Sequence, residues 1–239
     1  SVTGRRMRLA LTGVQFIISI ALIIVSAAFW TQYRYMMRFD MGFDRDNVLT
    51  FESTGAIAGR GNAFLSYLES DPDIAAVTTA SDDVIGLENT KSWWVDDIFV
   101  EVRNCDVRYN FFDVMGIPLI DGEGFSPSDE NRNRGVVVNR YLAETLDLHV
   151  GDLFTLGRVA GITDDVMMHD VSQNKQFMAW GCATDNMRFF YVRVHGGSDI
   201  RRVCDFIRSS VREFDPAADE PSIEFVDQHV ARLYDQVKR

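Results

Sequence analysis

The sequence predicts an α+β protein in which one N-terminal transmembrane helix and a stalk precede a two-lobed domain. Three observations support this fold class. Residues 9–30 form an uncharged, mainly apolar run of 22 residues. After residue 42, alternating strand patterns are mixed with amphipathic helix patterns. A strand–helix–strand pattern occurs at each end of the domain, and a stretch of shorter strands separates the two copies.

The run of residues 9–30 is long enough to cross a bilayer. As a helix it would measure about 33 Å, against a hydrocarbon core of about 30 Å. Trp30, Tyr33 and Tyr35 follow at its end, where aromatic rings favour the headgroup layer. A cleaved signal peptide is the main alternative, because residues 25–27 resemble a cleavage site. However, the run exceeds the usual apolar region of about 7–15 residues.

The charge distribution predicts the topology. Residues 1–8 form a basic flank with Arg5, Arg6 and Arg8, which places the N-terminus in the cytoplasm and the domain across the membrane. The chain carries a formal charge of −11, to which residues 1–40 contribute +4 and residues 41–239 contribute −15. An acidic domain is repelled by phosphate backbones, so no nucleic acid partner is expected.

Polar and small residues inside the apolar run predict contacts with neighbouring helices. Gln15 carries the one side-chain amide there, and an interhelical hydrogen bond contributes about 0.6–2 kcal/mol. Gly13 and Ser19 provide small contact points on the same helix. Residues 31–42 are expected to continue it as a stalk ending at the glycine at position 42, although a short interfacial helix is the alternative.

The first lobe, α/β in type, is expected to combine residues 43–118 with residues 187–239. In the first part we expect a strand at 48–51, a glycine-containing turn at 55–61, a helix capped by Asn62, a strand at 75–80, an irregular polar segment at 82–96, a strand at 98–103 and a helical turn at 111–115. In the second part we expect a strand at 189–195, a helix capped by Ser198, a strand at 222–226 and a helix capped by Asp227.

The second lobe, residues 119–186, is expected to be rich in β-structure and inserted into the first. A buried-type strand covers residues 135–138, and Asn139 is positioned to cap a short helix after it. Residues 153–163 predict a hairpin with Gly157 at its turn.

Familiar catalytic and cofactor motifs are missing. The chain has no nucleotide-binding loop, no GxSxG, no HExxH and no paired CxxC. We therefore expect no catalytic residues, no metal and no cofactor in this chain. The three cysteines, Cys105, Cys182 and Cys204, favour free thiols over a single bridge.

Two acidic clusters suggest metal sites, but each has a simpler explanation. Residues 164–170 contain three carboxylates and His169, with no second histidine at ligand spacing. Asp82, Asp83 and Glu88 lack the regular oxygen ligands and glycine of a calcium loop. We interpret both clusters as solvated polar loops.

Two pairs of adjacent residues are candidates for partner contact. Trp93 and Trp94 could form an exposed aromatic surface, or one ring could anchor the core while the other partly covers it. Met167 and Met168 could form an adaptable contact patch, or could pack beneath their loop.

The order of several short motifs resembles the FtsX/MacB-type permeases of ABC transporters. These motifs are VQFIISI at residues 14–20, MGFD at 41–44, VRYNFFDVMGI at 107–117, GEGF at 122–125, VVVN at 136–139, VAGITDDV at 159–166 and FVD at 225–227. Three positions depart from the family pattern. The family often has Gly-Arg-x-Phe at 122–125, Leu-Gly at 146–147 and Trp-Glu-Gly where Trp93, Trp94 and Val95 stand, so any cargo specificity of that loop would differ.

This resemblance implies a two-lobed periplasmic domain and a non-enzymatic role. A separate cytoplasmic ATP-binding subunit would hydrolyse ATP, and stalks would carry the motion to the periplasmic domains. The chain would be a fragment of a larger permease in the bacterial inner membrane. Implied partners are membrane lipid, another permease half or protomer, and an envelope protein or a peptide or lipoprotein cargo.

Two other functions remain open from the residues. A membrane-tethered periplasmic sensor or binding module would share the same architecture. A tethered hydrolase would need a catalytic set that the motifs do not supply. Further spanning helices after Arg239 would favour the permease, whereas a stop codon or a kinase domain would favour the sensor.

Overall fold

The computed structural model describes residues 2–37, 47–58, 60–86, 89–95, 97–129, 135–166, 176–185 and 187–237. The chain divides into two compact units, residues 1–40 and residues 41–239. The described residues of the first unit form one helix, and the second unit contains the sheet.

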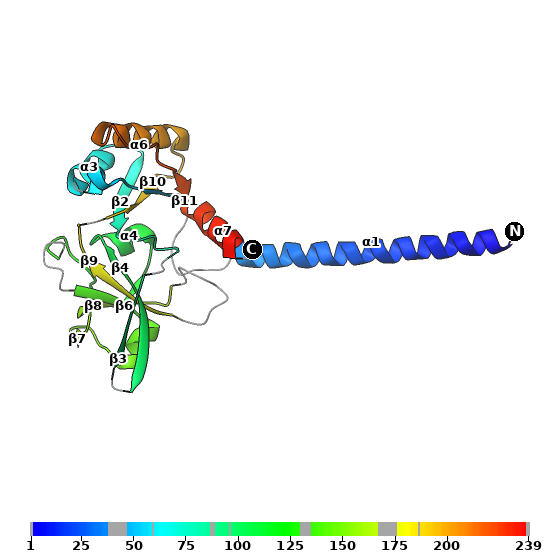
Figure 1. Ribbon diagram of the computed structural model, residues 1–239, viewed down its shortest axis with the longest axis horizontal. Helices are drawn as coiled ribbons and strands as arrows, with labels where there is room; N and C mark the ends of the chain where they lie inside the picture. Colours follow the sequence, from blue (N-terminus) through cyan, green and yellow to red (C-terminus); the bar gives the residue numbers. More distant parts are fainter. Residues whose placement is uncertain are drawn as a thin grey trace. The chain divides into compact units, whose positions relative to one another are not determined.

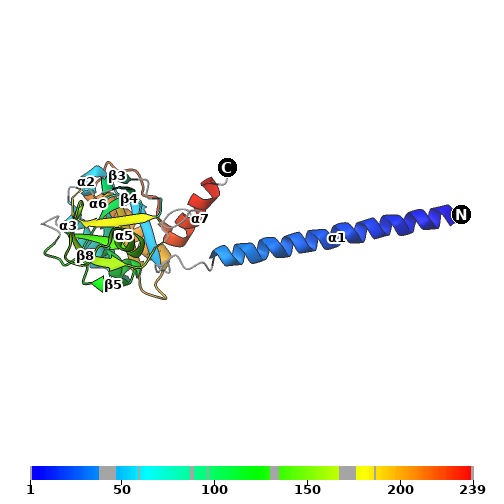
Figure 2. The ribbon, with the colours of Figure 1, turned by 90° about the horizontal axis from the view of Figure 1, so that it is seen from below.

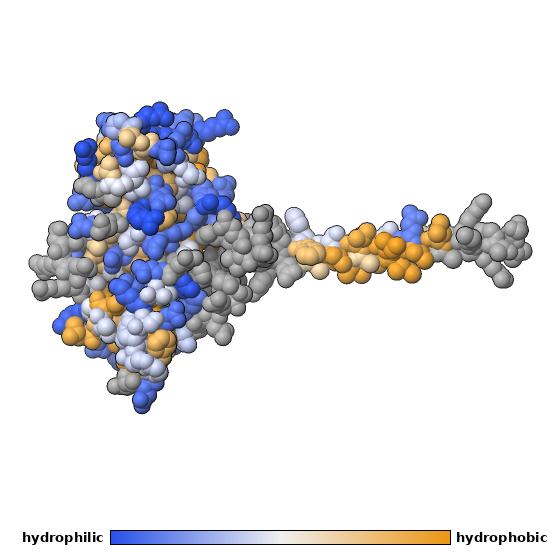
Figure 3. All heavy atoms as spheres, in the orientation of Figure 1, coloured by the Kyte–Doolittle hydropathy of each residue, from blue (hydrophilic) through white to orange (hydrophobic). Residues whose placement is uncertain are grey.

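Helix α1 (Val2–Met37) is 36 residues long and unbroken (Figures 1 and 2). Its segment Leu11–Thr31 has a mean hydropathy of 2.2 and buries none of its side chains within the chain. Among the described residues, it is the one helix long and apolar enough to span a membrane. Figure 3 shows this segment as a hydrophobic band. The predicted helix is confirmed, and helical structure extends into the expected stalk as far as Met37, while residues 38–42 lie outside the described residues.

In the described part of the chain, eleven strands form one sheet. Nine follow the order β11 (Glu224–Phe225), β1 (Val48–Glu52), β10 (Phe189–Val194), β2 (Ile74–Ala80), β4 (Ile98–Val107), β9 (Phe177–Cys182), β6 (Gly135–Asn139), β8 (Gly157–Thr163), β5 (Leu119–Gly122). In addition, β3 (Thr90–Val95) pairs with β4, and β7 (Leu153–Phe154) pairs with β8. The neighbours β4–β9 and β6–β8 are parallel.

The first four strands in this order come from both ends of the domain, as the repeated strand–helix–strand pattern predicted. Helices α3 (Gly61–Glu69) and α6 (Ile200–Phe214) lie together on one side of these strands (Figure 1). Their apolar faces meet the sheet in one core, in which Phe190 stacks on Phe51 at 5.2 Å and meets Phe64 edge-on. The amphipathic pattern of α6 is confirmed, because Val203, Ile207 and Val211 are buried.

A second core lies among the remaining strands and helix α5 (Arg140–Leu146). Asn139 caps α5 as predicted, because its side chain accepts a hydrogen bond from the backbone N–H of Leu142. Val100 and Val102 of β4 pack in this core, together with Val136 and Val138 of β6. The division into lobes at residues 118 and 186 therefore stays a proposal, since one sheet runs through both parts and β4 contributes to the second core.

Several local predictions were wrong. Residues 55–58 form the short helix α2 (Gly55–Ala58) instead of a turn. Asn62 lies inside α3, whose N-cap residue is Arg60. Asp199, and not Ser198, caps α6 by accepting from the N–H groups of Arg201 and Arg202. Asp199 directly precedes the first turn of α6, so its carboxylate reaches the second and third N–H groups of the helix. Ser198 lies one residue further from that turn.

Two further segments differ from the prediction, one at the end of the domain and one before β4. Strand β11 is only two residues long, and α7 (Val226–Val237) begins before Asp227. Residues 82–96 are not irregular throughout, because β3 pairs with β4 in a continuous antiparallel ladder. Threonine, tryptophan and valine favour such a ladder, and this preference prevails over the local polarity. The helical turn α4 (Phe111–Met115) agrees with the prediction, and Gly116 follows it in a left-handed conformation.

Candidate partner-binding surface

The β3–β4 hairpin separates the two predicted tryptophans onto opposite faces. Trp93 lies opposite Val100 and packs against the second core, with its ring 5.7 Å from that of Phe154. Trp94 lies opposite Phe99, with 5.3 Å between ring centroids, and remains 67% exposed. Successive strand residues point to opposite faces, so Trp93 is a core anchor and Trp94 is available at the surface.

The exposed face of this hairpin is apolar at its tip. Phe99 is 53% exposed beside Trp94, whereas Ile98, which is 43% exposed, lies on the opposite face with Val100. Among the coloured residues of the domain in Figure 3, hydrophilic ones cover more of the visible face than hydrophobic ones. A cluster of exposed aromatic side chains is typical of protein-binding surfaces.

An open groove of about 310 Å³ lies beside the same face. Phe99 forms one aromatic wall, and the rings of Tyr141 and Phe177, stacked at 4.7 Å, form another. The polar side chains of the groove are Thr90, Glu101, Arg103 and Gln176. The groove can therefore accept a ligand that has both apolar and polar groups.

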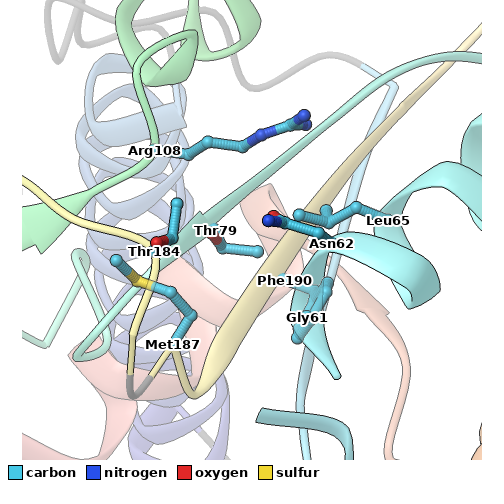
Figure 4. Close-up of a pocket in the computed structure, with 8 residues that line it drawn as sticks. All are labelled: Gly61, Asn62, Leu65, Thr79, Arg108, Thr184, Met187 and Phe190. Carbon is cyan, nitrogen blue, oxygen red and sulfur yellow. The ribbon is translucent and has the colours of Figure 1, made fainter. Parts of the chain in front are cut away.

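A second pocket is too small for such a ligand (Figure 4). Its volume is about 10 Å³, which is about the space of one water molecule. Arg108 lies on one side of it and Asn62 and Leu65 on the other. The guanidinium of Arg108 donates to Glu69 at 2.8 Å and to the carbonyl of Val77 at 2.9 Å, which accounts for its position structurally.

Asp83, from the predicted acidic cluster of Asp82, Asp83 and Glu88, belongs to a partly buried network. Its Oδ2 lies 2.6 Å from Nε2 of His229, whose Nδ1 lies 2.7 Å from Oε1 of Glu224. The hydroxyl of Tyr191 accepts from the N–H of Val84 and contacts Oδ1 of Asp83 at 3.4 Å. This network joins α7 to β10 and to the segment after β2, so Asp83 has a structural role. Glu88 lies outside the described residues.

The same network raises the pKa of His229. Burial acts to lower this pKa, but the hydrogen bonds and charges of Asp83 and Glu224 outweigh burial and raise it above 6.5. Burial also raises the pKa of Tyr191 well above 10, and the nearby charge of Asp83 adds to this effect.

The described part of the acidic cluster at residues 164–170 supports helix α5. Asp164 pairs with Arg140 at 3.1 Å. Oδ1 of Asp165 accepts from the side chain of Asn139 at 3.0 Å and from the backbone N–H of Tyr141 at 2.9 Å. No group of three or more metal-ligating side chains occurs among the described residues. Met167, Met168 and His169 lie outside the residues that the structure describes, so the methionine contact patch stays a prediction.

The predicted helix-packing and topology residues all lie on helix α1. Gly13, Gln15 and Ser19 are exposed on α1, and Arg5, Arg6 and Arg8 lie in its first turns. Their roles in helix packing and topology stay predictions. None of the three cysteines forms a disulfide bond, and burial raises the pKa of Cys105 to about 11.

Sequence reasoning missed the groove residues Phe99, Glu101, Tyr141 and Phe177. One signal was available for the first two. Residues 98–103 alternate, so residues 99 and 101 had to share the face opposite the buried Val100 and Val102. Tyr141 and Phe177 come from a helix and a distant strand, and no local pattern indicates that they meet.

In the described part of the chain, the fold is a sheet-based domain that follows one long apolar helix. The chain belongs to the MacB-like periplasmic core domain family, whose model matches residues 9–209. The match includes the apolar helix and most of the domain, so membership in this family of ABC-transporter-type permease domains is shown.

Solved structures agree with this fold at low sequence identity. The periplasmic region of MacB from Actinobacillus actinomycetemcomitans is 13% identical, with a TM-score of 0.54, and the match covers 83% of this chain and 96% of that one. The extracellular domain of the noncanonic ABC-type transporter YknZ from Gram-positive bacteria is 8% identical, with a TM-score of 0.52 and coverages of 74% and 98%. A domain of a putative permease protein from Porphyromonas gingivalis is 15% identical, with a TM-score of 0.53 and coverages of 77% and 92%. No curated protein matches the chain.

Proposed function

We propose that this chain is part of a permease subunit that couples cytoplasmic ATP hydrolysis to work on the other side of the membrane. The work would be export, lipoprotein release or activation of a partner. The ATP-binding subunit would be a separate protein, and this chain would transmit motion without catalysing a reaction. In this proposal the N-terminus is cytoplasmic and the domain is periplasmic, at the inner membrane of a bacterium.

The continuity of α1 is the observation that carries this proposal. The helix is about 54 Å long at 1.5 Å per residue, whereas a hydrocarbon core is about 30 Å thick. Helical structure passes the end of the apolar segment at Thr31 and continues to Met37 without a break. A continuous helix transmits displacement better than a flexible linker, so it suits a lever more than a simple tether.

Two surfaces would serve this function. Gly13, Gln15 and Ser19 would pack against helices of another permease half or protomer. Trp94 and its exposed neighbours on the hairpin would contact the periplasmic partner or cargo, while Trp93 would hold the hairpin to the core. The methionines at positions 167 and 168 remain candidates for the same contact.

Copurification tests this proposal. The full-length membrane protein, extracted in a mild detergent, should bring down an ATP-binding subunit in a stoichiometric complex with ATPase activity. Purification of the protein alone, or with a sensor kinase in place of an ATPase, would refute the transport role. Gln15→Leu keeps the size of the side chain but removes its amide, and should weaken the association with the other permease half.

A further inference from the structure

The groove beside the β3–β4 hairpin contains a carboxylate with no ion pair. Glu101 is exposed, lines the groove together with Phe99, and pairs with no cation in the described part of the chain. Asp97, at the turn of the same hairpin, is also exposed. Arg103 also lines the groove, two residues further along β4, so the groove offers the carboxylate of Glu101 beside the aromatic wall of Phe99 and a guanidinium next to it.

The strand register fixes the spacing of these groups. Trp94 lies opposite Phe99, and Ser92 lies opposite Glu101, on the outer face of the hairpin. Residues two apart on one strand are about 7 Å apart. An apolar position and an acidic position therefore lie about 7 Å apart along the strand.

We infer that this groove binds an extended, basic segment of a partner protein, in which an apolar residue and a lysine or arginine are two positions apart. The apolar side chain would lie against Trp94 and Phe99, and the cation would pair with Glu101. The cation would also lie near the ring of Phe99, where a cation–π contact adds about 0.5–1 kcal/mol at an exposed site.

Three observations favour a basic protein segment over other ligands. The charge of −15 on residues 41–239 repels anionic ligands, and the carboxylate of Glu101 acts in the same direction beside Phe99, while Arg103 offsets it further along the groove. Asp97 at the tip opposes insertion of the hairpin into a lipid bilayer. Among the described strands, β3 pairs only with β4, so its outer edge has backbone groups available for an extended peptide.

This inference rests on the proposed function only in naming the bound protein as cargo or regulator of the permease. Binding itself requires no ATP-binding subunit. Failure of the copurification experiment would count against the proposed function alone, and the experiment below tests the groove by itself.

The test uses the full chain in phosphatidylcholine nanodiscs and fluorescence anisotropy. The probe is a fluorescein-labelled heptapeptide in which threonines alternate with leucine, arginine and leucine. A second peptide has glutamate in place of arginine, and empty nanodiscs give the background. We expect the arginine peptide to bind at least about tenfold more tightly than the glutamate peptide, because it places apolar and cationic groups two residues apart.

Charge reversal provides the decisive comparison. Glu101→Lys should reverse the preference in favour of the glutamate peptide. Glu123→Lys makes the same change in net charge at an exposed position that does not line the groove, and should change the affinity by less than about twofold. Both variants should unfold at the same urea concentration as the wild type.

Several results would overturn the inference. One is equal affinity for the two peptides, and another is an equal loss of binding in the two lysine variants, which would indicate attraction by overall charge. If neither peptide binds but maltoheptaose does, the groove belongs to a glycan and not to a protein segment.

Discussion

His229 on α7 and Asp83 after β2 are 146 positions apart in the sequence, and the Nε2 atom of His229 lies 2.6 Å from Oδ2 of Asp83. Glu224 contacts the other ring nitrogen, and Arg232 lies 2.8 Å from that nitrogen and 2.6 Å from Glu224. The imidazole is therefore in contact with two carboxylates and one guanidinium. The hydroxyl of the buried Tyr191 contacts Asp83 as well. This contact fixes the first turns of α7 to the rest of the domain.

The stability of the domain should therefore depend on the charge of His229. The folded-state pKa of this histidine is raised above 6.5. Its contribution is complete below the unfolded-state pKa, and is lost as the pH rises through the folded-state pKa. We expect His229→Gln to reduce the free energy of unfolding by about 1–3 kcal/mol at about pH 5.5, and by about 1 kcal/mol less at about pH 9.

Urea unfolding followed by tryptophan fluorescence measures this dependence. His149→Gln is the matched control, because the His149 side chain is 73% exposed and lies 3.7 Å from Asp152. It should change the stability by less than about 0.5 kcal/mol at either pH. If the free energy of unfolding changes with pH in the same way in the wild type and in His229→Gln, the charge of His229 does not contribute to stability.

Arg202 should hold α6 against the start of β2. Its guanidinium donates to both oxygens of Asp71, at 2.9 and 2.5 Å, and its Nε donates to Asp73 at 2.8 Å. The Asp71 side chain is only 5% exposed, and its hydrogen bonds with Arg202 lower its pKa, although burial opposes this shift. We expect Arg202→Ala to reduce the free energy of unfolding by about 2 kcal/mol, because it leaves a buried carboxylate without its cation.

The loss of unfolding free energy caused by Arg202→Ala should also depend on pH. Asp71 has a lowered folded-state pKa, so its contribution is present above its unfolded-state pKa and disappears as the pH falls through the folded-state pKa. Denaturant unfolding at neutral pH and near pH 3 checks this. Arg201→Ala, one residue earlier and exposed, serves as the control. An equal effect of both substitutions would contradict the role of Arg202.

The adjacent tryptophans should respond differently to truncation. Trp93 packs in the second core, whereas Trp94 is 67% exposed. We expect Trp93→Ala to destabilise the protein by about 2–3 kcal/mol, and Trp94→Ala to do so by less than about 1 kcal/mol. Thermal or urea unfolding of the two variants gives the comparison. If Trp94→Ala destabilised the protein more than Trp93→Ala, then Trp94 and not Trp93 would be the residue that packs in the core.

The success of sequence reasoning varied with the range of the interactions. The apolar helix, α6 and the Asn139 cap follow from local periodicity and capping chemistry, and were predicted. The choice of Asp199 over Ser198 as a cap depends on backbone geometry, and the strand around Trp93 depends on its pairing with β4. Neither is visible in a local pattern.

The site was harder to predict for the same reason. Trp93 and Trp94 could be identified as an aromatic pair from the sequence. Which of the two faces the core follows only from their register with Val100 and Phe99. The groove needs Tyr141 and Phe177 to stack across 36 positions of sequence. The network around His229 needs three segments that only the folded sheet brings together.

In the proposed function, α1 carries a change driven by ATP to the domain. A helix break in the segment after Thr31 tests this most directly, with Tyr33→Pro compared with Tyr33→Ala, since proline inside a helix costs about 3 kcal/mol. The measurement is the distance between spin labels at Glu144→Cys in two protomers of the complete permease with its ATP-binding subunit. We predict that ATP shifts this distance in the wild type and in Tyr33→Ala but not in Tyr33→Pro, with ATP hydrolysis retained in all three. The same ATP-dependent shift in Tyr33→Pro would mean that the domain moves without a continuous α1.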